Sequence, residues 1–492
     1  MSFDAMLAVR AFELGCAQRT ALFRHRAVAA DPLAIIAFEL GAEPYTVGSI
    51  ALGRESDGAQ VFVPGQPIDR RLLFPALLDF ARVFCAVFES HARGPMETVT
   101  HFGRALEIPS ALPQVLVPNE QTIKILYRLG RRLAYLRTDG DTPADPLLPR
   151  LGRHLMWLTR YSATPGQQLL LPVAQLVREH WATAMSGYEA GSLAALEAWI
   201  KPTPGLTGAE AAAAAEMQVV GPTLSPADAE AVSLLMEQFE DRRQRSIDPE
   251  VYSPYLGPLR HFYAARTEQT WQLLWQAANR ERAIPAAQSV VRRDREDRIE
   301  YARHLEWMNG GAEGRRKARP TLRSNVIEKR RLESAQSLLD AEEAIDDPLR
   351  MLPQIVAGLA LAGQVTASNA NRREPVGGRN CLRPSITVRT DEPCSMPLGT
   401  DVWWSTAASE REWVISSIIR AGEGSEVVLI LQTNRRLKAG FPASGQRVCF
   451  TQIAIKQPYE ASLPKSAPWT HRAPEPEVDD LDSAESQEVA AA

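Results

Sequence analysis

The sequence contains few of the residues, and none of the motifs, by which an enzymatic activity is most easily recognised. Its 5 cysteines are far apart and form no Cys-x-x-Cys pair, which argues against a disulfide framework and against a cysteine zinc site. No P-loop, no Gly-x-Gly-x-x-Gly after a strand, no Gly-x-Ser-x-Gly elbow and no His-Glu-x-x-His occurs. The 8 histidines are scattered, and none is paired at metal-ligand spacing. We therefore predict neither a bound metal nor a cofactor.

Long apolar runs are also missing. No stretch of about 18 uncharged apolar residues occurs, and the first residues lack a basic segment followed by an apolar run. We therefore expect no signal peptide, no membrane span and a cytoplasmic location. Lysine is scarce, with 7 of the 55 basic residues, and this arginine bias is typical of a GC-rich genome and fits a bacterial source.

The net charge of −4 excludes a global basic field that would attract nucleic acid, so any such attraction must come from a local patch. A chain of 492 residues predicts two to four domains. We expect an α+β fold with five segments. They are an α/β unit (1–140), a helical domain (141–310), a basic linker with helices (311–365), a small β-barrel (380–456) and a disordered acidic tail (470–492).

The α/β unit is indicated by short β-branched runs that alternate with helical spacing. The expected strands are Leu33–Leu40, Tyr45–Leu52, Gln60–Val63 and Gln114–Val117. Helical spacing follows from Leu72 to Phe88, and Asn119 is a good N-cap for a second helix.

The C-terminal barrel is indicated by β-branched and aromatic segments separated by glycines. We expect one more helix before it, from Met351 to Leu361 and stopped by Gly363. The five expected strands are Ser385–Arg389, Asp401–Trp404, Trp413–Ile419, Glu426–Gln432 and Arg447–Ile453. From Pro474 on, the chain carries seven acids and no base, which predicts a disordered acidic tail.

The strongest charge feature is the basic stretch from Gly314 to Arg331, which holds a single acid, Glu328. Its basic residues are Arg315, Arg316, Lys317, Arg319, Arg323, Lys329, Arg330 and Arg331. Arginine forks match phosphate oxygens, and several together can follow a nucleic-acid backbone. Two other interpretations remain open. The stretch is a solvated linker or a helix face paired with later acids on the same helix, or it binds the acidic tail.

The barrel supplies a second candidate surface. Trp403 and Trp404 are neighbours on one expected strand, so they point to opposite faces and at most one lies in the core. Small barrels often stack bases on surface aromatics. We therefore include both tryptophans among the candidate nucleic-acid-binding residues.

One enzymatic alternative concerns three acids of the α/β unit. Nucleases of the RNase H-like class hold two metal ions on acids from a first strand, a helix and the end of a later strand. Glu39, Asp79 and Glu120 occur in this order along the chain. They are the candidate catalytic residues of this alternative, although Glu120 also suits the first turn of a helix.

The preferred hypothesis is a non-enzymatic bacterial cytoplasmic protein that binds DNA or RNA, or scaffolds a partner that does, through the basic stretch and the barrel. The first alternative is the metal-dependent nuclease. The second is a protein-interaction scaffold whose helical middle docks a protein partner, which predicts a large exposed apolar patch on those helices.

Overall fold

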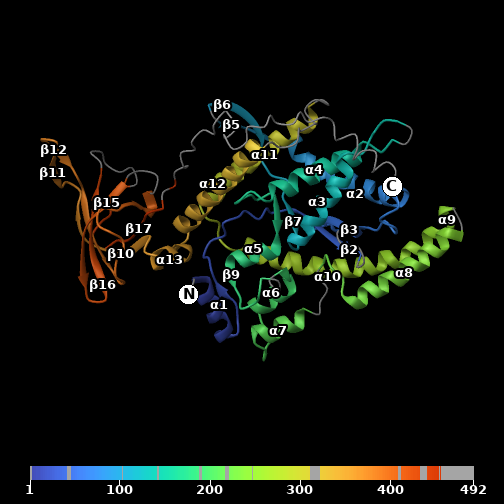
Figure 1. Ribbon diagram of the computed structural model, residues 1–492, viewed down its shortest axis with the longest axis horizontal. Helices are drawn as coiled ribbons and strands as arrows, with labels where there is room; N and C mark the ends of the chain where they lie inside the picture. The colour runs from blue at the N-terminus through green and yellow to red at the C-terminus, as the bar shows by residue number, and fades with distance from the viewer. Residues whose placement is uncertain are drawn as a thin grey trace, which may run out of the picture.

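The computed structural model describes residues 3–40, 46–101, 103–140, 143–187, 191–216, 221–245, 248–310, 322–407, 412–432, 440–453 and 455. The predicted α+β class is confirmed: a body of helices around a sheet is joined to a closed β-barrel, which stands at one end of the molecule (Figure 1). None of the described helices is both long enough and apolar enough to cross a membrane.

The sheet of the body has five strands in the order β4-β3-β2-β7-β8. They are β2 (Leu33–Glu39), β3 (Val47–Arg54), β4 (Gly58–Phe62), β7 (Val115–Val117) and β8 (Leu170–Pro172). The strands β2, β3 and β4 form an antiparallel meander, and β7 and β8 extend it in parallel. The central strand β2 is buried along almost its whole length, as expected for a strand covered on both faces.

Helices cover both faces of this sheet. One face packs on α2 (Arg70–Ser90), α3 (Glu120–Ala134) and α4 (Leu147–Tyr161), with residues of α11 (Ser289–Asn309) at the edge of the cluster. The other face packs on α5 (Val173–His180), α6 (Leu193–Ile200), α8 (Pro226–Arg245) and α10 (Leu256–Arg282). The apolar stripe of α2 and the cap Asn119 of α3 have the predicted form.

The remaining elements of the body are short or peripheral. They are α1 (Phe3–Leu14), β1 (Gln18–Arg19), β5 (Met96–His101), β6 (Arg104–Pro109), β9 (Trp181–Ala182), α7 (Gly208–Ala215) and α9 (Pro249–Tyr252). The β5–β6 hairpin was not predicted. The strand β8 was not predicted either, and the sheet therefore takes its fifth strand from a segment in which we expected helices.

Two helices carry the chain from the body to the barrel. They are α12 (Leu322–Asp346) and α13 (Pro348–Val356). Ala344 of α12 and Met351 of α13 form a small buried cluster with Ala360 at the start of the barrel, and Cys449 and Ile453 pack against it. The barrel is thus held against the end of this helix pair.

The barrel has six strands, so the prediction of five is wrong. The closed order β10-β13-β16-β15-β14-β17 contains β10 (Ala360–Asn369), β13 (Ser385–Thr390), β14 (Asp401–Trp404), β15 (Glu412–Ala421), β16 (Gly424–Leu431) and β17 (Arg447–Thr451). The missed strand is β10. The predicted helix to Leu361 ends earlier because Gly358 adopts a positive φ of 72°, and Gly363 lies inside β10 rather than after a helix.

Close packing of α3 on α4 depends on two glycines. A Cβ at Gly152 would lie 2.3 Å from the backbone nitrogen of Ala134, and one at Gly130 would lie 3.0 Å from that of Met156. These contacts are with backbone, which cannot rotate away as a side chain can. The two helices could not approach so closely with a larger residue at Gly152.

We predict that Gly152→Ala lowers the free energy of unfolding by about 1–3 kcal/mol, the usual cost of overpacking. The matched control is Gly257→Ala in α10, where a Cβ meets open space. This control should raise stability by up to about 1 kcal/mol, because alanine is the better helix former. Denaturant unfolding measures both, and equal effects would contradict the packing argument.

Candidate nucleic-acid interface

The acidic end of α12 is fixed to the body by a buried ion-pair cluster. Glu342 is 3% exposed. Its Oε1 lies 2.5 Å from Arg292 Nε, and its Oε2 accepts from Arg292 Nη2 at 2.8 Å and from Arg293 Nη1 at 2.6 Å. Both arginines belong to α11. The carboxylate is therefore committed to α11 and is not available to the basic residues on its own helix.

Asp347 fixes the joint between α12 and α13. Its side chain caps α13 by accepting from Leu349 N at 2.8 Å, and it also accepts from Leu22 N at 2.6 Å and Phe23 N at 2.9 Å. Burial alone would raise the pKa of Asp347. Hydrogen bonds from His25 and from these backbone groups outweigh burial and hold the pKa below its ordinary value. The N-terminal segment and the helix pair are thus tied together by one carboxylate.

The basic end of α12 is exposed instead. Arg323, Lys329 and Arg331 are exposed and Arg330 is half-buried. Arg323 and Arg330 are seven residues apart, so they lie on one face of the helix about 10 Å apart. This end of α12 presents a row of cations to solvent.

Two of these cations have acidic neighbours on the same helix. Lys329 lies 3.6 Å from Glu333, and Arg331 lies 2.8 Å from Glu328. Exposed pairs of this kind contribute roughly 0–1 kcal/mol, so they can be exchanged for a phosphate at little cost. Arg331 also donates to Thr164 Oγ1 at 3.2 Å, which brings the basic row against the end of α4.

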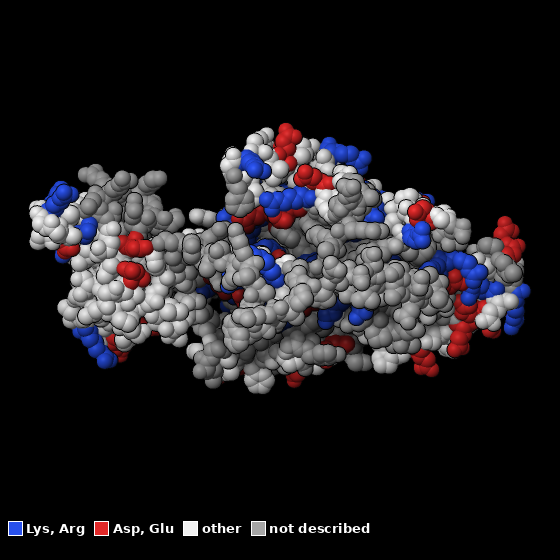
Figure 2. Space-filling model, turned by 45° about the horizontal axis from the view of Figure 1, so that its top comes forward, with Lys and Arg blue, Asp and Glu red and all other residues white. Residues whose placement is uncertain are grey.

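The other half of the predicted basic stretch, with Arg315, Arg316, Lys317 and Arg319, lies outside the described residues. The predicted acidic tail, 470–492, lies outside them as well. Lys and Arg side chains also gather at the outer end of the barrel, as the space-filling view shows (Figure 2).

The two candidate tryptophans occupy different environments, as their alternation predicts. Trp404 is 3% exposed and lies in the barrel core with Trp413 and Phe450, so its ring cannot stack on a base. Trp403 is half-buried on the other face of β14. Trp403 is therefore the one of the pair that remains a candidate for contact with a ligand.

The three acids of the nuclease alternative lie on different elements. Glu39, at the end of β2, accepts from Gln121 at 3.4 Å, next to Glu120 at the start of α3. Asp79 is exposed on α2 and pairs with Arg82 at 2.6 Å. In the described part of the chain these three do not form a group of ligand atoms within 4.8 Å of one another.

Cys85, Glu89 and His154 do form such a group, with ligand atoms within 4.8 Å of one another. Glu89 lies 2.5 Å and 2.9 Å from two nitrogens of Arg150, and His154 Nε2 lies 2.7 Å from Glu89 Oε1. Burial opposes the charge on Glu89, but the hydrogen bonds from His154 and Arg150 lower its pKa to about 2. Arg150 already supplies the positive charge that a metal ion would bring, so the group acts as a half-buried ion-pair network.

Sequence reasoning missed this network because its members come from three helices. His154 Nδ1 and His304 Nε2 are 2.9 Å apart although the residues are 150 positions apart in the chain. The local signal was weak: Cys85 and Glu89, and likewise Arg150 and His154, are four residues apart on their helices and so share a face.

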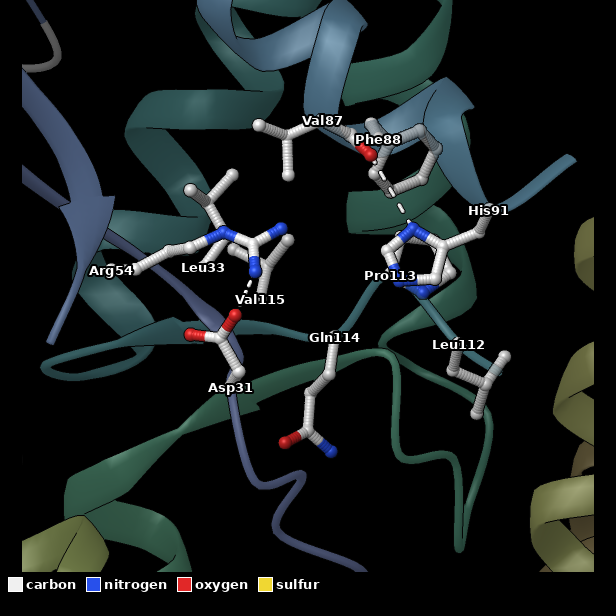
Figure 3. Close-up of a pocket in the computed structure, with 10 residues that line it drawn as sticks. All are labelled: Asp31, Leu33, Arg54, Val87, Phe88, His91, Leu112, Pro113, Gln114 and Val115. Atoms are coloured by element: carbon white, nitrogen blue, oxygen red, sulfur yellow. Dashed lines mark hydrogen bonds and ion pairs between the residues drawn. The ribbon is translucent and has the colours of Figure 1, made fainter. Parts of the chain in front are cut away.

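The hollow drawn in Figure 3 is too small for a metabolite. It holds about 10 Å³, room for about one water molecule, whereas small-molecule sites span roughly 300–1,000 Å³. The ion pair of Arg54 with Asp31 closes one side, and on the other side His91 Nδ1 donates to Val87 O at 3.3 Å. The hollow lies at the amino ends of β2 and β7, opposite to the carboxyl ends where open α/β sheets bind ligands.

A buried carboxyl on α11 carries a strongly shifted pKa. Asp297 is 2% exposed, and its oxygens accept from Tyr161 Oη at 2.7 Å and from Gln168 N at 2.8 Å. Both donors are neutral. Burial therefore prevails over these hydrogen bonds and raises the pKa of Asp297 to about 7.

Comparison with known proteins gives no relative: no family model matches the sequence, and neither a curated protein nor a solved structure matches it.

We predict that Glu342→Ala destabilises the protein by about 3–5 kcal/mol, because it leaves Arg292 and Arg293 without their buried partner. The control Glu333→Ala removes an exposed partner from the same helix and should change stability by less than about 1 kcal/mol. Denaturant unfolding compares the two. A Glu342→Ala variant as stable as the control would show that the ion pairs do not anchor α12.

We also predict a pH dependence from Asp297. Because its folded pKa is raised, the folded state binds a proton that the unfolded state has released, and stability falls as pH rises from about 5 to 8. The loss should be about 2–3 kcal/mol in wild type and absent in Asp297→Asn. Denaturant unfolding of wild type and of Asp297→Asn at about pH 5 and pH 8 measures the difference in stability. Identical pH dependence of stability in the two proteins would contradict a raised pKa of Asp297.

Proposed function

We propose that this protein is a non-enzymatic nucleic-acid-binding protein, or a scaffold of a nucleic-acid complex, that acts through its basic stretch and its C-terminal barrel. The observation that carries the proposal is the division of α12. Its acids at Glu342 and Glu343 face Arg292, Arg293 and Arg350 of neighbouring helices, whereas its cations Arg323, Lys329 and Arg331 are exposed.

This division argues against one competing interpretation of the basic stretch. Had Glu342 and Glu343 paired with the cations of the same helix, the helix would be neutral along its surface. Those two acids are engaged elsewhere, and the acids that pair with Lys329 and Arg331 on this helix, Glu333 and Glu328, are themselves exposed. A phosphate backbone would compete well with such weakly held partners, because each bound phosphate also releases condensed counterions.

The scaffold alternative is favoured by a different surface. Four large apolar side chains of α1 are more than two-fifths exposed: Met6, Val9, Phe12 and Leu14. They lie on the N-terminal helix and not on the helical middle for which we expected a docking patch. A protein partner on α1 is compatible with nucleic-acid binding by α12, since the two helices present separate surfaces.

The test is binding of the full chain to labelled single- and double-stranded DNA and RNA, titrated across salt. Wild type should bind with an affinity that falls steeply with salt, by a log–log slope of about 0.9 for each phosphate contacted. The variant with Arg323, Lys329, Arg330 and Arg331 changed to alanine should bind more weakly and with a shallower slope, as should the variant with Arg315, Arg316, Lys317 and Arg319 changed to alanine.

The matched control changes four exposed arginines elsewhere on the body, Arg10, Arg82, Arg137 and Arg303. It removes the same net charge and should leave affinity within about twofold. No binding of wild type at low salt would end the proposal and make the scaffold alternative the leading one. If the control variant lost as much affinity as the two basic-stretch variants, binding would depend on net charge alone and not on the basic stretch.

A further inference from the structure

A separate two-stranded arm projects from the barrel. Its strands are β11 (Arg373–Val376) and β12 (Arg379–Leu382), and in the described chain they pair with each other and with no barrel strand. Gly377 and Gly378, with φ of 56° and 78°, make the tight turn between them, as a two-residue hairpin loop requires. Figure 1 shows the arm at the far end of the barrel from the body.

The arm is basic, and none of its residues is fully buried. From 372 to 383 it holds four arginines and one acid, Glu374. Glu374 sits at the base, 2.8 Å from Arg372 and 3.9 Å from Arg383. The two remaining arginines, Arg373 and Arg379, are exposed. Arg373 lies at the base of the arm, where it pairs with Leu382, and Arg379 lies beside the turn at its tip.

The register places these two cations on opposite faces of the arm. Arg379 is paired with Val376, whereas Arg373 is three residues before Val376 on the same strand and so points to the other face. A ribbon with a cation on each face suits a channel with negative charge on both walls. The groove of a nucleic-acid duplex, which runs between two phosphate backbones, is such a channel.

The size and composition of the arm narrow the choice of nucleic acid. Sheets pack about 10 Å apart face to face, so the ribbon with its side chains is about 10 Å thick between the faces that carry the two arginines, and it fits a B-form major groove about 12 Å wide but not a minor groove of about 6 Å. The major groove of A-form RNA is too narrow for it. Residues 372–383 include no aromatic side chain, and single strands are typically bound by stacking on aromatics.

We propose that the β11–β12 arm enters the major groove of duplex DNA, with Arg373 and Arg379 contacting phosphates on its two walls. This inference rests on the proposed function and specifies its substrate class as B-form DNA. An isolated hairpin gains little stability from its own strands. None of the described residues 372–383 belongs to the buried apolar cluster of the barrel, so the arm is better explained by what it binds than by what it contributes to the core.

The experiment compares the double variant Arg373→Ala/Arg379→Ala with wild type on a labelled 20-base-pair DNA duplex, its single strand and the matching RNA duplex. The variant should bind the DNA duplex at least about tenfold more weakly at 0.1 M salt, with a slope lower by about 2. Its affinity for RNA should be unchanged. Guanine N7 methylation in the major groove should be blocked by wild type and restored with the variant.

The matched control is Arg389→Ala/Arg447→Ala, which removes two exposed arginines from the barrel wall and should stay within about twofold of wild type. Circular dichroism checks that each variant keeps its fold. Equal affinity of the arm variant and wild type for duplex DNA would overturn the inference while leaving the proposed function intact. Equal displacement of DNA by polyglutamate would also overturn it, because the arm would then bind any acidic polymer.

Discussion

The arrangement of the charged surface depends on the placement of Glu342 between Arg292 and Arg293. A buried carboxylate cannot be left without a partner, and this one has two, both from α11. The pairing fixes the second half of α12 against the body. The buried residues of α12 all lie in this second half, and in the first half Arg323 and Arg331 are exposed. Asp347 then sets the direction in which the chain leaves for the barrel.

Pairing of acids with nearby arginines also explains how a molecule with a negative net charge can have basic surfaces. Most arginines of the body, such as Arg26, Arg150 and Arg266, are engaged with nearby acids. The basic end of α12 and the β11–β12 arm are two places where cations outnumber acids locally. Since charges separated by more than about 10 Å are screened at ordinary salt, these local surfaces can act on a polyanion despite the net charge of −4.

Much of the fold could be predicted from local patterns. The continuous apolar run of β2, the stripe of α2 and the cap at Asn119 are strong signals, because each reflects the environment of one element. The missed strands have weaker patterns. The strand β8 is three residues long and is defined by its pairing with β7, and β10 begins with Ala-Leu-Ala, which continues a helical pattern as readily as it starts a strand.

The candidate site was predictable only where it depends on local sequence and not on tertiary contacts. The charge of the basic stretch is visible in the sequence, but the partner of Glu342 is 49 and 50 residues away in the chain. The contact of His154 with His304 and the separation of the arm from the barrel likewise depend on tertiary structure. The prediction that at most one of Trp403 and Trp404 lies in the core needed only the period of a strand.

The most direct test of this account is photo-crosslinking of the full chain to a duplex DNA that carries reactive bases, followed by mass spectrometry of the linked peptides. Crosslinks are predicted to be concentrated in two segments, the basic stretch 314–331 and the arm 372–383. Crosslinks spread evenly over exposed arginines of the body, or located on α1 and the helical middle, would contradict it.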